Sequence, residues 1–594
     1  MKIIAFLFAI ICCAVIHGAI PFLSVPTLQQ ALWTSGFAES YINAGWPAIF
    51  ATNFGYPLPA AIAFGLSGSF LQSTFIALFN MPPAPAYSLM TLCYLILSLW
   101  GALRLAQLLG LSDFLALLAA LVWCSSAVIW AHLDYSMLAL SVALLPFYLW
   151  NVQLVCQMQT NNRWNIIQRA ILFSLVCLLA VFMDGYGYMM FIVGGAILIA
   201  NEAAVVFQWN KDFSSTRAFL IKAGIFILGI GLSYFLYTWF IGFADFDKMS
   251  QSFFRGWGAD VSFFWIPTQG VYGLWDTLHF GLERSAVHYF GDASVWTASF
   301  SAVYILLAIT SFCLLRKQKG RLLYAFVIMV LFGFYMSLGP SLKFFSVRPA
   351  HDIDAHHFDV LMPAEYAIAP TGSGVLSEHL PGFKVMRASY RWVALGQVGA
   401  WGLLVLLLVR LQEKRKKKWA ALLALLVIIT NLPSSARIAH TFRIPAAWDD
   451  IDKHLAAPLN RVIKPGSLVA FMPVGNDFLV NYFASVGNYR AYNIGGDKNL
   501  AMAQKQWPQP LQDSYRALLG QNTNRRVCLD IKRLFDETKT EYVIIPYIDL
   551  LFGTPPTAES TQVLKNKYQS DVNCLKDMGG FQVTEEQYFA VVVR

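Results

Sequence analysis

The chain has 594 residues, of which 57% are hydrophobic and only 13% carry a charge. A water-soluble protein of this length needs far more charged surface, so the composition excludes a protein whose only solvent is water. The formal net charge of +9 does not indicate nucleic-acid binding, because the densest basic clusters before the C-terminal tail lie in short loops between apolar segments. We therefore expect a lipid bilayer around most of the chain and no nucleic acid as a partner.

Eleven apolar segments predict transmembrane helices, because one crossing takes roughly 20 apolar residues. The first segment also has features of a cleavable signal peptide, since Lys2 precedes a short apolar core and His17-Gly18-Ala19 loosely resembles a cleavage site. The apolar stretch continues past Ala19, which favours a retained helix. The predicted spans are approximately 3–23, 86–103, 113–131, 135–157, 169–183, 187–208, 218–242, 296–315, 322–341, 392–411 and 419–433.

Two basic clusters orient these spans. Residues 316–321 contain four basic residues and no acid, and Lys414–Lys418 are five basic residues in a row. Loops rich in Lys and Arg stay in the cytoplasm, so the N-terminus is predicted to be cytoplasmic and the C-terminal tail to lie outside. The long outer loops are then 24–85, 243–295 and 342–391.

The tail has a different pattern, in which short β-rich runs alternate with polar stretches that are compatible with helices. This pattern is typical of a small α/β domain. The sequence therefore predicts an α-helical polytopic membrane protein with about eleven transmembrane helices at 1–433 and a small α/β extracytoplasmic domain at 434–594. The β-rich runs are Ser467–Val474, Tyr542–Pro546 and Tyr588–Val593, and the helix-compatible stretches include Pro508–Leu519 and Val563–Gln569.

Cysteine positions support this topology. Seven of the nine cysteines lie in apolar spans, where Cys behaves as a small hydrophobic residue. Cys528 and Cys574 are the only two in the tail, and in an oxidising compartment they would pair as a disulfide. The alternative is two unrelated buried thiols.

No signature of a soluble enzyme is present: the sequence has no Walker loop, no GxGxxG after a strand, no HExxH and no CxxC. Without a nucleotide-binding signature, the energy for any transfer reaction must come with the substrate. An activated lipid-linked donor would supply it.

Glu39 is the only acidic residue among the first 112, and it lies in a long outer loop rich in aromatic residues, Gly and Pro. A lone carboxylate beside apolar surface is poorly solvated, which raises its affinity for a proton and makes it a candidate proton acceptor. The alternative is that Glu39 caps a short interfacial helix.

Short outer turns carry three further candidates. His132-Leu133-Asp134 joins the third and fourth predicted spans, and Asp184 lies in the turn between the fifth and sixth. Ionisable groups at membrane depth are costly and usually face a cavity or a partner, so His132, Asp134 and Asp184 are candidates for lining a site. The alternative is a solvated turn, since Asp and Gly are common turn formers.

Arg387 and Arg391 enter the tenth predicted span from outside, and they would share one helical face if this stretch is helical. Guanidinium groups pair bidentately with phosphate oxygens, so these arginines are candidates for holding a lipid phosphate. The alternative is interfacial anchoring, with the arginines snorkelling beside Tyr390 and Trp392.

Two outer loops carry weaker signals. The run His351–Asp359 has residue types that bind metals, but its spacing matches no metal site, so a solvated loop is the better interpretation. The loop 243–295 combines aromatic residues with acids, which suits an interfacial cover over a cavity and equally suits anchoring in the bilayer. The sequence assigns no metal ligand and establishes no cofactor, and it leaves open whether the protein uses a divalent metal.

The whole arrangement resembles the GT-C superfamily of polytopic membrane glycosyltransferases. One span is followed by a long outer loop with an acid, the cytoplasmic loops are short, and a C-terminal domain lies outside. Residues 45–57, which read GWPAIFATNFGYP, resemble the first loop of bacterial members. Residues 381–391 resemble their Phe-Arg-x-x-x-Arg entry into a late span, with Met386 in place of the Phe.

The resemblance implies an enzyme that takes a sugar from a polyprenyl-phosphate carrier, usually with inversion. By position, Glu39 would deprotonate the acceptor hydroxyl, Asp134 would help to position a substrate, and Arg387 or Arg391 would bind the departing phosphate. The first-loop acid is Glu rather than the commoner Asp, and no paired acid stands beside it as in metal-dependent members. Metal dependence is therefore open.

We thus predict a glycosyltransferase of the bacterial inner (plasma) membrane that moves a sugar from a polyprenyl-phosphate donor to a glycan or glycolipid acceptor on the periplasmic face. The alternatives are a transporter or flippase for a lipid-linked glycan, and a scaffold. The absence of an internal repeat and the clustering of polar candidates at one surface favour an enzyme. The predicted catalytic residues are Glu39, Asp134 and Asp184, and the predicted substrate-binding residues are His132, Arg387 and Arg391.

Overall fold

The computed structural model describes residues 2–209, 213–242, 249–318, 320–354, 360–518, 526–552 and 555–594. The chain forms two compact units, each built from segments that are distant in sequence. In the described chain, unit 1 comprises residues 2–19, 91–239 and 249–440, and unit 2 comprises residues 20–90, 240–242 and 441–594. The loop 24–85 was predicted to belong with the membrane spans, whereas in the structure it belongs to the same unit as the tail.

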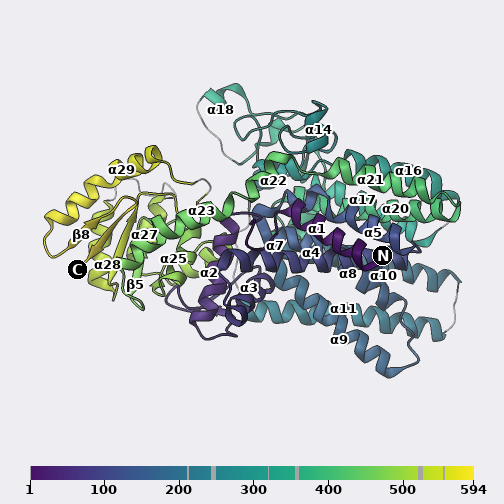
Figure 1. Cartoon of the computed structure of the whole chain (residues 1–594), viewed down its shortest axis with the longest axis horizontal. Helices are drawn as coiled ribbons and strands as arrows, with labels where there is room; N and C mark the ends of the chain where they lie inside the picture. The colour runs from purple at the N-terminus through teal and green to yellow at the C-terminus, as the bar shows by residue number, and fades with distance from the viewer. Residues whose placement is uncertain are drawn as a thin grey trace. The chain divides into compact units, whose positions relative to one another are not determined.

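Unit 1 consists mainly of long apolar helices (Figure 1). Its principal helices are α1 (Lys2–His17), α4 (Pro83–Leu108), α5 (Asp113–Cys124), α6 (Ala127–Trp130), α7 (Ser136–Ala143), α8 (Leu145–Cys156), α9 (Arg163–Met183), α10 (Gly185–Trp209), α11 (Phe213–Ile241), α16 (Ala302–Leu315), α17 (Arg321–Ser337), α20 (Val393–Glu413) and α21 (Lys417–Asn431). The first turns of α4 belong to unit 2.

Shorter elements connect these helices on the loops of unit 1. They are η1 (Leu133–Tyr135), α12 (Gln251–Gly256), α13 (Val261–Trp265), α14 (Gly273–Thr277), α15 (Ala293–Ala298), η2 (Arg316–Gln318), β3 (Ser341–Leu342), α18 (Ala350–Asp354), η3 (Ala364–Tyr366), β4 (Ala369–Pro370), α19 (Ser373–His379), η4 (Phe383–Val385), η5 (Ser389–Trp392) and α22 (Ser435–Thr441).

All eleven predicted spans coincide with helices. In the part of the chain that the structure describes, eight helical segments are long and apolar enough to cross a membrane. The three remaining predicted spans, 3–23, 322–341 and 419–433, correspond to the shorter helices α1, α17 and α21. The fold class is thereby confirmed as a helical polytopic membrane protein.

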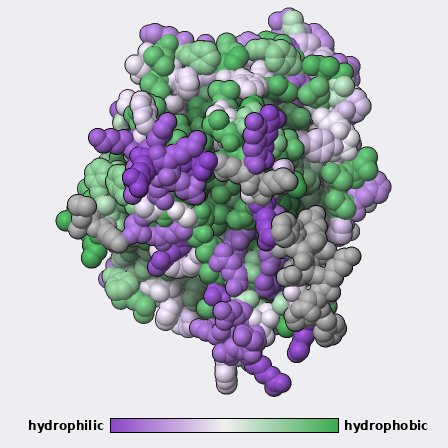
Figure 2. Space-filling model, turned by 90° about the vertical axis from the view of Figure 1, so that its right-hand side faces the viewer, coloured by the Kyte–Doolittle hydropathy of each residue, from purple (hydrophilic) through white to green (hydrophobic). Residues whose placement is uncertain are grey.

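The surface of unit 1 also fits a lipid environment. Ile3 and Phe8 on α1 are 76% and 64% exposed, and Leu228 and Trp239 on α11 are each 73% exposed. Such helix faces would be unfavourable in water but match the hydrocarbon of a bilayer. Figure 2 shows one end of the molecule, where hydrophilic residues gather in patches among hydrophobic ones.

Helix α20 packs unusually close to α17. A Cβ atom added at Gly333 of α17 would lie 2.2 Å from the backbone of Gly396, and one at Gly399 would lie 2.8 Å from the Phe326 carbonyl oxygen. Small residues at these positions let the two backbones approach, as is common between membrane helices. This packing holds the start of α20, which begins two residues after Arg391.

Unit 2 is an α/β body around a five-stranded sheet with the order β6-β5-β7-β9-β8 (Figure 1). Strand β5 is parallel to β6 and β7, whereas β9 is antiparallel to β7 and β8. The strands are β5 (Leu468–Phe471), β6 (Arg490–Ala491), β7 (Tyr542–Pro546), β8 (Gln582–Glu585) and β9 (Phe589–Val593). The predicted small α/β tail domain is therefore present.

The other elements of unit 2 come from both ends of the chain. The first loop contributes α2 (Gln29–Asn43), β1 (Phe50–Ala51), β2 (Ala60–Ala61) and α3 (Leu66–Phe79). The tail contributes α23 (Ile444–Ile451), the π-helical turn η6 (Asp452–Ala456), α24 (Ala457–Val462), α25 (Phe478–Val486), α26 (Asp497–Gln504), α27 (Gln509–Leu518), α28 (Val527–Glu537) and α29 (Ala558–Asp577).

Helix α2 packs tightly against α25 of the tail. A Cβ atom at Gly36 would lie 2.5 Å from the backbone of Asn481, so this position has room only for glycine. The Ser485 hydroxyl donates to the Gly36 carbonyl at 2.8 Å, and the Asn43 side chain donates to the Ser485 carbonyl at 2.8 Å. Because they form one unit, the first loop and the tail must lie on the same side of the membrane. The ten predicted spans between them satisfy this condition, since ten is an even number.

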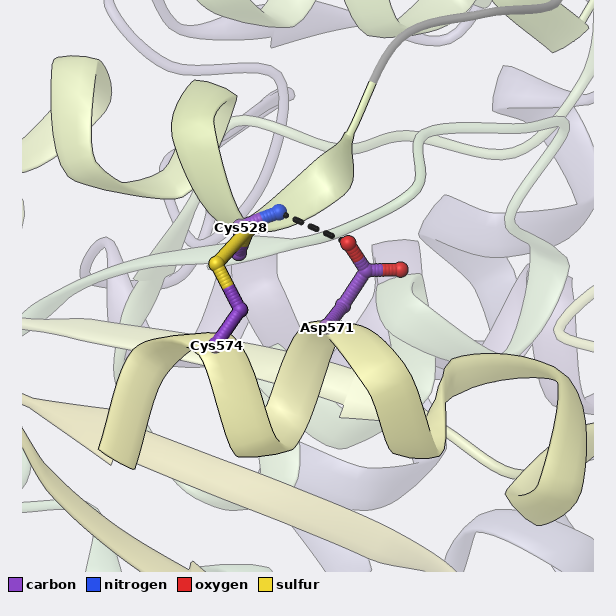
Figure 3. The surroundings of a disulfide bond; sticks show 3 residues. All are labelled: Cys528, Asp571 and Cys574. Carbon is purple, nitrogen blue, oxygen red and sulfur yellow. Dashed lines mark hydrogen bonds between the residues drawn. A yellow bond between two sulfur atoms is a disulfide. The ribbon is translucent and has the colours of Figure 1, made fainter. Parts of the chain in front are cut away.

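Cys528 on α28 and Cys574 on α29 form a disulfide, with their Cα atoms 6.2 Å apart and a sequence separation of 46 (Figure 3). The backbone N–H of Cys528 donates to the Asp571 carboxylate at 3.1 Å and adds a second link between the two helices (Figure 3). The bond joins the start of α28 to the last turns of α29.

Replacing Cys528 and Cys574 with Ser is expected to lower the free energy of unfolding of unit 2 by about 2–4 kcal/mol, because the broken loop adds conformational freedom to the unfolded chain. Limited proteolysis of the full-length protein in detergent across a urea series, with tail peptides read by mass spectrometry, measures the effect. The control is Cys313→Ser, which changes an exposed thiol on α16. Equal protease resistance of the double variant and the control would contradict the prediction.

Candidate functional site

The arginine cluster of unit 1 consists of Arg391 and the rings of Tyr135, Tyr186 and Tyr390. The guanidinium carbon lies 4.6 Å from the centre of the Tyr135 ring, 4.5 Å from that of Tyr186 and 5.7 Å from that of Tyr390. The Arg391 Nε donates to the Tyr390 hydroxyl at 3.3 Å. Cation–π contacts of this kind stabilise a positive charge that is partly withdrawn from water.

The tyrosines of the arginine cluster are themselves held by hydrogen bonds. The Tyr135 hydroxyl donates to the Asp292 carboxylate at 2.6 Å, and Asp292 caps α15 by accepting from the Ser294 backbone at 2.9 Å. The hydroxyls of Ser294 and Tyr390 are 2.6 Å apart. The Tyr186 hydroxyl accepts from the backbone N–H of Ala388 at 3.0 Å. These bonds fix the rings around the guanidinium group.

Arg391 keeps donors for a ligand. In the part of the chain that the structure describes, neither Nη1 nor Nη2 has a hydrogen-bond acceptor, and no carboxylate forms an ion pair with the guanidinium group. A fork of N–H groups without an acid partner is suited to bind a phosphate bidentately. The cluster is therefore a candidate anion site.

Arg387 lies in a different setting. Its guanidinium carbon is 5.4 Å from the centre of the Phe253 ring. The backbone between η4 and η5 is not helical, because Ala388 has ψ 79°. Arg387 and Arg391 therefore do not share a helical face. The candidate anion site is built around Arg391.

His132 is fully buried and stacks on Tyr390, with ring centres 5.5 Å apart and planes at 28°. Its Nδ1 lies 2.6 Å from the Val128 carbonyl oxygen, so this nitrogen carries the proton and donates. Burial, followed by the charge of Arg391, lowers the pKa of His132 to about 3, so the ring is neutral. Its Nε2 is then an acceptor without a hydrogen-bond partner in the described structure.

The two predicted aspartates differ. Asp134 is exposed on η1, next to Tyr135 of the arginine cluster. Asp184 is buried, and its Oδ1 accepts from the backbone N–H groups of Tyr186 at 2.8 Å and Gly187 at 3.0 Å. These are the hydrogen bonds of a helix cap, and they orient the start of α10 and with it Tyr186.

The glutamate cluster of unit 2 consists of Glu39, Asp452, Tyr482 and Trp448. Glu39 is half-buried on α2, one turn after Gly36, on the side that packs against α25. The Tyr482 hydroxyl donates to Asp452 at 2.8 Å, and the Trp448 Nε1 donates to the Tyr482 hydroxyl at 2.9 Å. Burial, and then the nearby charge of Asp452, raises the pKa of Glu39 to about 7. A carboxyl group with this pKa can take up a proton near neutral pH.

Among the residues that the structure describes, no group of three or more His, Cys, Asp or Glu side chains is placed to hold a metal ion. His351–Asp354 belong to α18, and residues 355–359 of the same run lie outside the described residues.

Several residues of these two clusters were not predicted from the sequence. Tyr135 and Tyr186 directly follow or nearly follow predicted site residues, so aromatic residues beside Asp134 and Asp184 were a usable signal. Asp292 comes from a distant loop, and no local pattern marks it. Asp452 and Tyr482 belong to the tail, whose packing against α2 is a long-range contact.

No family model matches the chain, and no curated protein matches it. Among solved structures, ArnT from Cupriavidus metallidurans in the apo state matches with a TM-score of 0.50 and 10% identity, over 99% of this chain and 97% of that one. The oligosaccharyltransferase of Archaeoglobus fulgidus in the apo form matches with 0.47 and 11% identity, over 92% and 69%. The mycobacterial arabinofuranosyltransferase AftD matches with 0.48 and 12% identity, over 92% and 35%.

The match to ArnT extends over nearly the full length of both chains. At 10% identity, this match is evidence for a shared fold. The chain has the GT-C fold of polytopic membrane glycosyltransferases.

Proposed function

We propose that the protein is a membrane glycosyltransferase that takes a sugar from a polyprenyl-phosphate carrier and transfers it to a glycan or glycolipid. The observation that supports this most directly is the guanidinium group of Arg391, which lies among three tyrosine rings and has two nitrogens without an acceptor in the described part of the chain. A half-buried cation of this kind at the entry to a membrane helix fits the phosphate of a lipid carrier.

In this proposal Arg391 binds the phosphate of the donor and stabilises the negative charge that develops when the bond to the sugar breaks. Glu39 accepts the proton of the acceptor hydroxyl while that oxygen attacks the anomeric carbon. The C–O bond to the phosphate breaks, and its electron pair leaves with the phosphate. No covalent enzyme intermediate is needed.

The other predicted residues take supporting roles in the proposal. The His132 Nε2 is an acceptor suited to a hydroxyl group of a substrate. Asp134 is exposed on η1 next to Tyr135 and is proposed to help position a substrate, whereas Asp184 acts through Tyr186 by capping α10. Arg387 is proposed as a second, more peripheral contact for the carrier.

We further propose that the protein lies in a bacterial inner membrane with unit 2 in the periplasm. The basic clusters at 316–321 and 414–418 support a cytoplasmic position for those loops. The disulfide between Cys528 and Cys574 supports an oxidising compartment for the tail.

The test is a transfer assay. Purified protein in detergent is incubated with radiolabelled polyprenyl-phosphate hexoses and with glycan fractions of the outer envelope, and we expect label to move from the lipid phase to the glycan. The control is heat-inactivated protein. Binding of the lipid without transfer from any donor, combined with movement of the labelled lipid across proteoliposomes, would support the transporter alternative instead.

A further inference from the structure

The tail of the chain brings a second carboxylate to the predicted base. Asp452 follows α23 directly, and its charge acts on Glu39, the only carboxylate of α2. Gly36 packs closely against Asn481, and Tyr482 is the next residue of α25. Glu39 lies one turn after Gly36, and its charge acts on Tyr482. The two acids thus belong to one cluster although they are more than four hundred residues apart in sequence.

Asp452 is held in a fixed position. The Tyr482 hydroxyl donates to it at 2.8 Å, and the Trp448 Nε1 donates to the same hydroxyl at 2.9 Å. The rings of Trp448 and Tyr482 meet edge to face at 5.6 Å, and both side chains are 2% exposed. Asp452 is also the first residue of the π-helical turn η6, and such turns inside helices frequently occur at functional sites.

We propose that Asp452 is a positioning residue for the acid–base step at Glu39, so that the tail domain supplies part of the reaction centre. This inference rests on the proposed function, because it assigns the second carboxylate to the same proton transfer. Burial raises the pKa of Asp452, and the hydrogen bond from Tyr482, whose hydroxyl Trp448 orients, opposes this rise and favours the ionised form.

The effect follows from electrostatics. A neighbouring negative charge disfavours ionisation of Glu39 and strengthens its affinity for the proton of the acceptor hydroxyl. That proton moves to Glu39 as the acceptor oxygen attacks, and it later leaves to solvent. The other ionisable groups on the elements around this pair are Asp449, Asp450, Lys453 and His454, which are exposed on α23 and η6, and Tyr41, which is buried on α2.

The experiment measures protonation of Glu39 directly and without any substrate. Dicyclohexylcarbodiimide reacts with protonated carboxyl groups in apolar surroundings, and labelling of the Glu39 peptide in the full-length protein is followed by mass spectrometry from pH 5 to 9. We expect the midpoint of labelling to move to lower pH by about one unit in Asp452→Asn. In Tyr482→Phe we expect a smaller shift in the same direction, because Asp452 loses the donor that favours its ionised form.

Matched variants decide the interpretation. Asp452→Glu keeps the charge and is expected to keep the midpoint of the unmodified protein, and Asp450→Asn removes an adjacent exposed acid and is expected to leave the midpoint unchanged. An unchanged midpoint in Asp452→Asn would overturn the proposal, as would an equal shift in Asp450→Asn. The labelling does not depend on catalysis, so a shift without any sugar transfer would keep the carboxylate pair and reject the proposed function alone.

Discussion

Replacing Arg391 with Lys is expected to lower the rate of sugar transfer by about a hundredfold or more. Lysine keeps the positive charge, but its ammonium group cannot form the bidentate fork to phosphate, and it cannot stack on the faces of the tyrosine rings as a planar guanidinium group does. The three ring contacts of 4.6, 4.5 and 5.7 Å are matched to a planar guanidinium group. The measurement is kcat/KM for transfer from a radiolabelled polyprenyl-phosphate sugar.

The matched control for Arg391 lies on α20, the helix that follows it. Arg410 belongs to α20, near its other end, where its Nη1 pairs with Glu413 at 3.1 Å. Arg410→Lys is expected to transfer sugar at nearly the rate of the unmodified protein, because an exposed ion pair tolerates the exchange. If Arg391→Lys behaves like Arg410→Lys, the guanidinium group does not bind the donor phosphate.

Replacing Glu39 with Gln is expected to reduce transfer by about 10²–10⁴-fold, the usual contribution of a general base. Because the pKa of Glu39 is raised to about 7, the group is protonated and inactive as a base at lower pH. The rate of the unmodified protein should therefore rise with pH up to about 7 and then level off. Measuring kcat/KM of both proteins over a pH series tests for this rise, the acidic limb of the pH–rate profile.

The Gln variant is expected to show a low rate without the limb near pH 7. Glu39→Asp serves as the comparison, since it keeps a carboxylate that is shorter by one methylene group. Full activity of Glu39→Gln in a folded protein would remove Glu39 as the base and leave the function of the raised pKa unexplained.

Much of the fold could be predicted because hydropathy determines which segments enter a bilayer. Each predicted span coincides with a helix, and Tyr542–Pro546 was predicted with its observed bounds. What the sequence could not show is that the first loop belongs to the tail. Gly36 can approach the backbone of Asn481 because glycine has no side chain. A single Gly in a helix has no local pattern that would indicate such a contact.

The candidate site shows the same division. Glu39 and Arg391 were predicted because a lone acid and an outer arginine both run against the local composition. Tyr135 and Asp292, which shape the setting of Arg391, are ordinary residues in their own segments, and their roles arise from a 2.6 Å hydrogen bond between distant loops. Arg387 and Arg391 were predicted to share one face only if their segment is helical. The non-helical backbone at Ala388 shows that it is not.

The composition of unit 2 also has a consequence for biogenesis. Helix α2 is made well before its partner α25, which is translated only after the ten predicted spans between them. Until then Trp33 lacks the Gly495 carbonyl to which it donates at 2.8 Å in the finished protein. The first loop must wait in an incomplete state, with the surface that α25 covers still exposed. A nascent chain truncated before residue 478 would remain in that state, because it lacks the partner helix of α2.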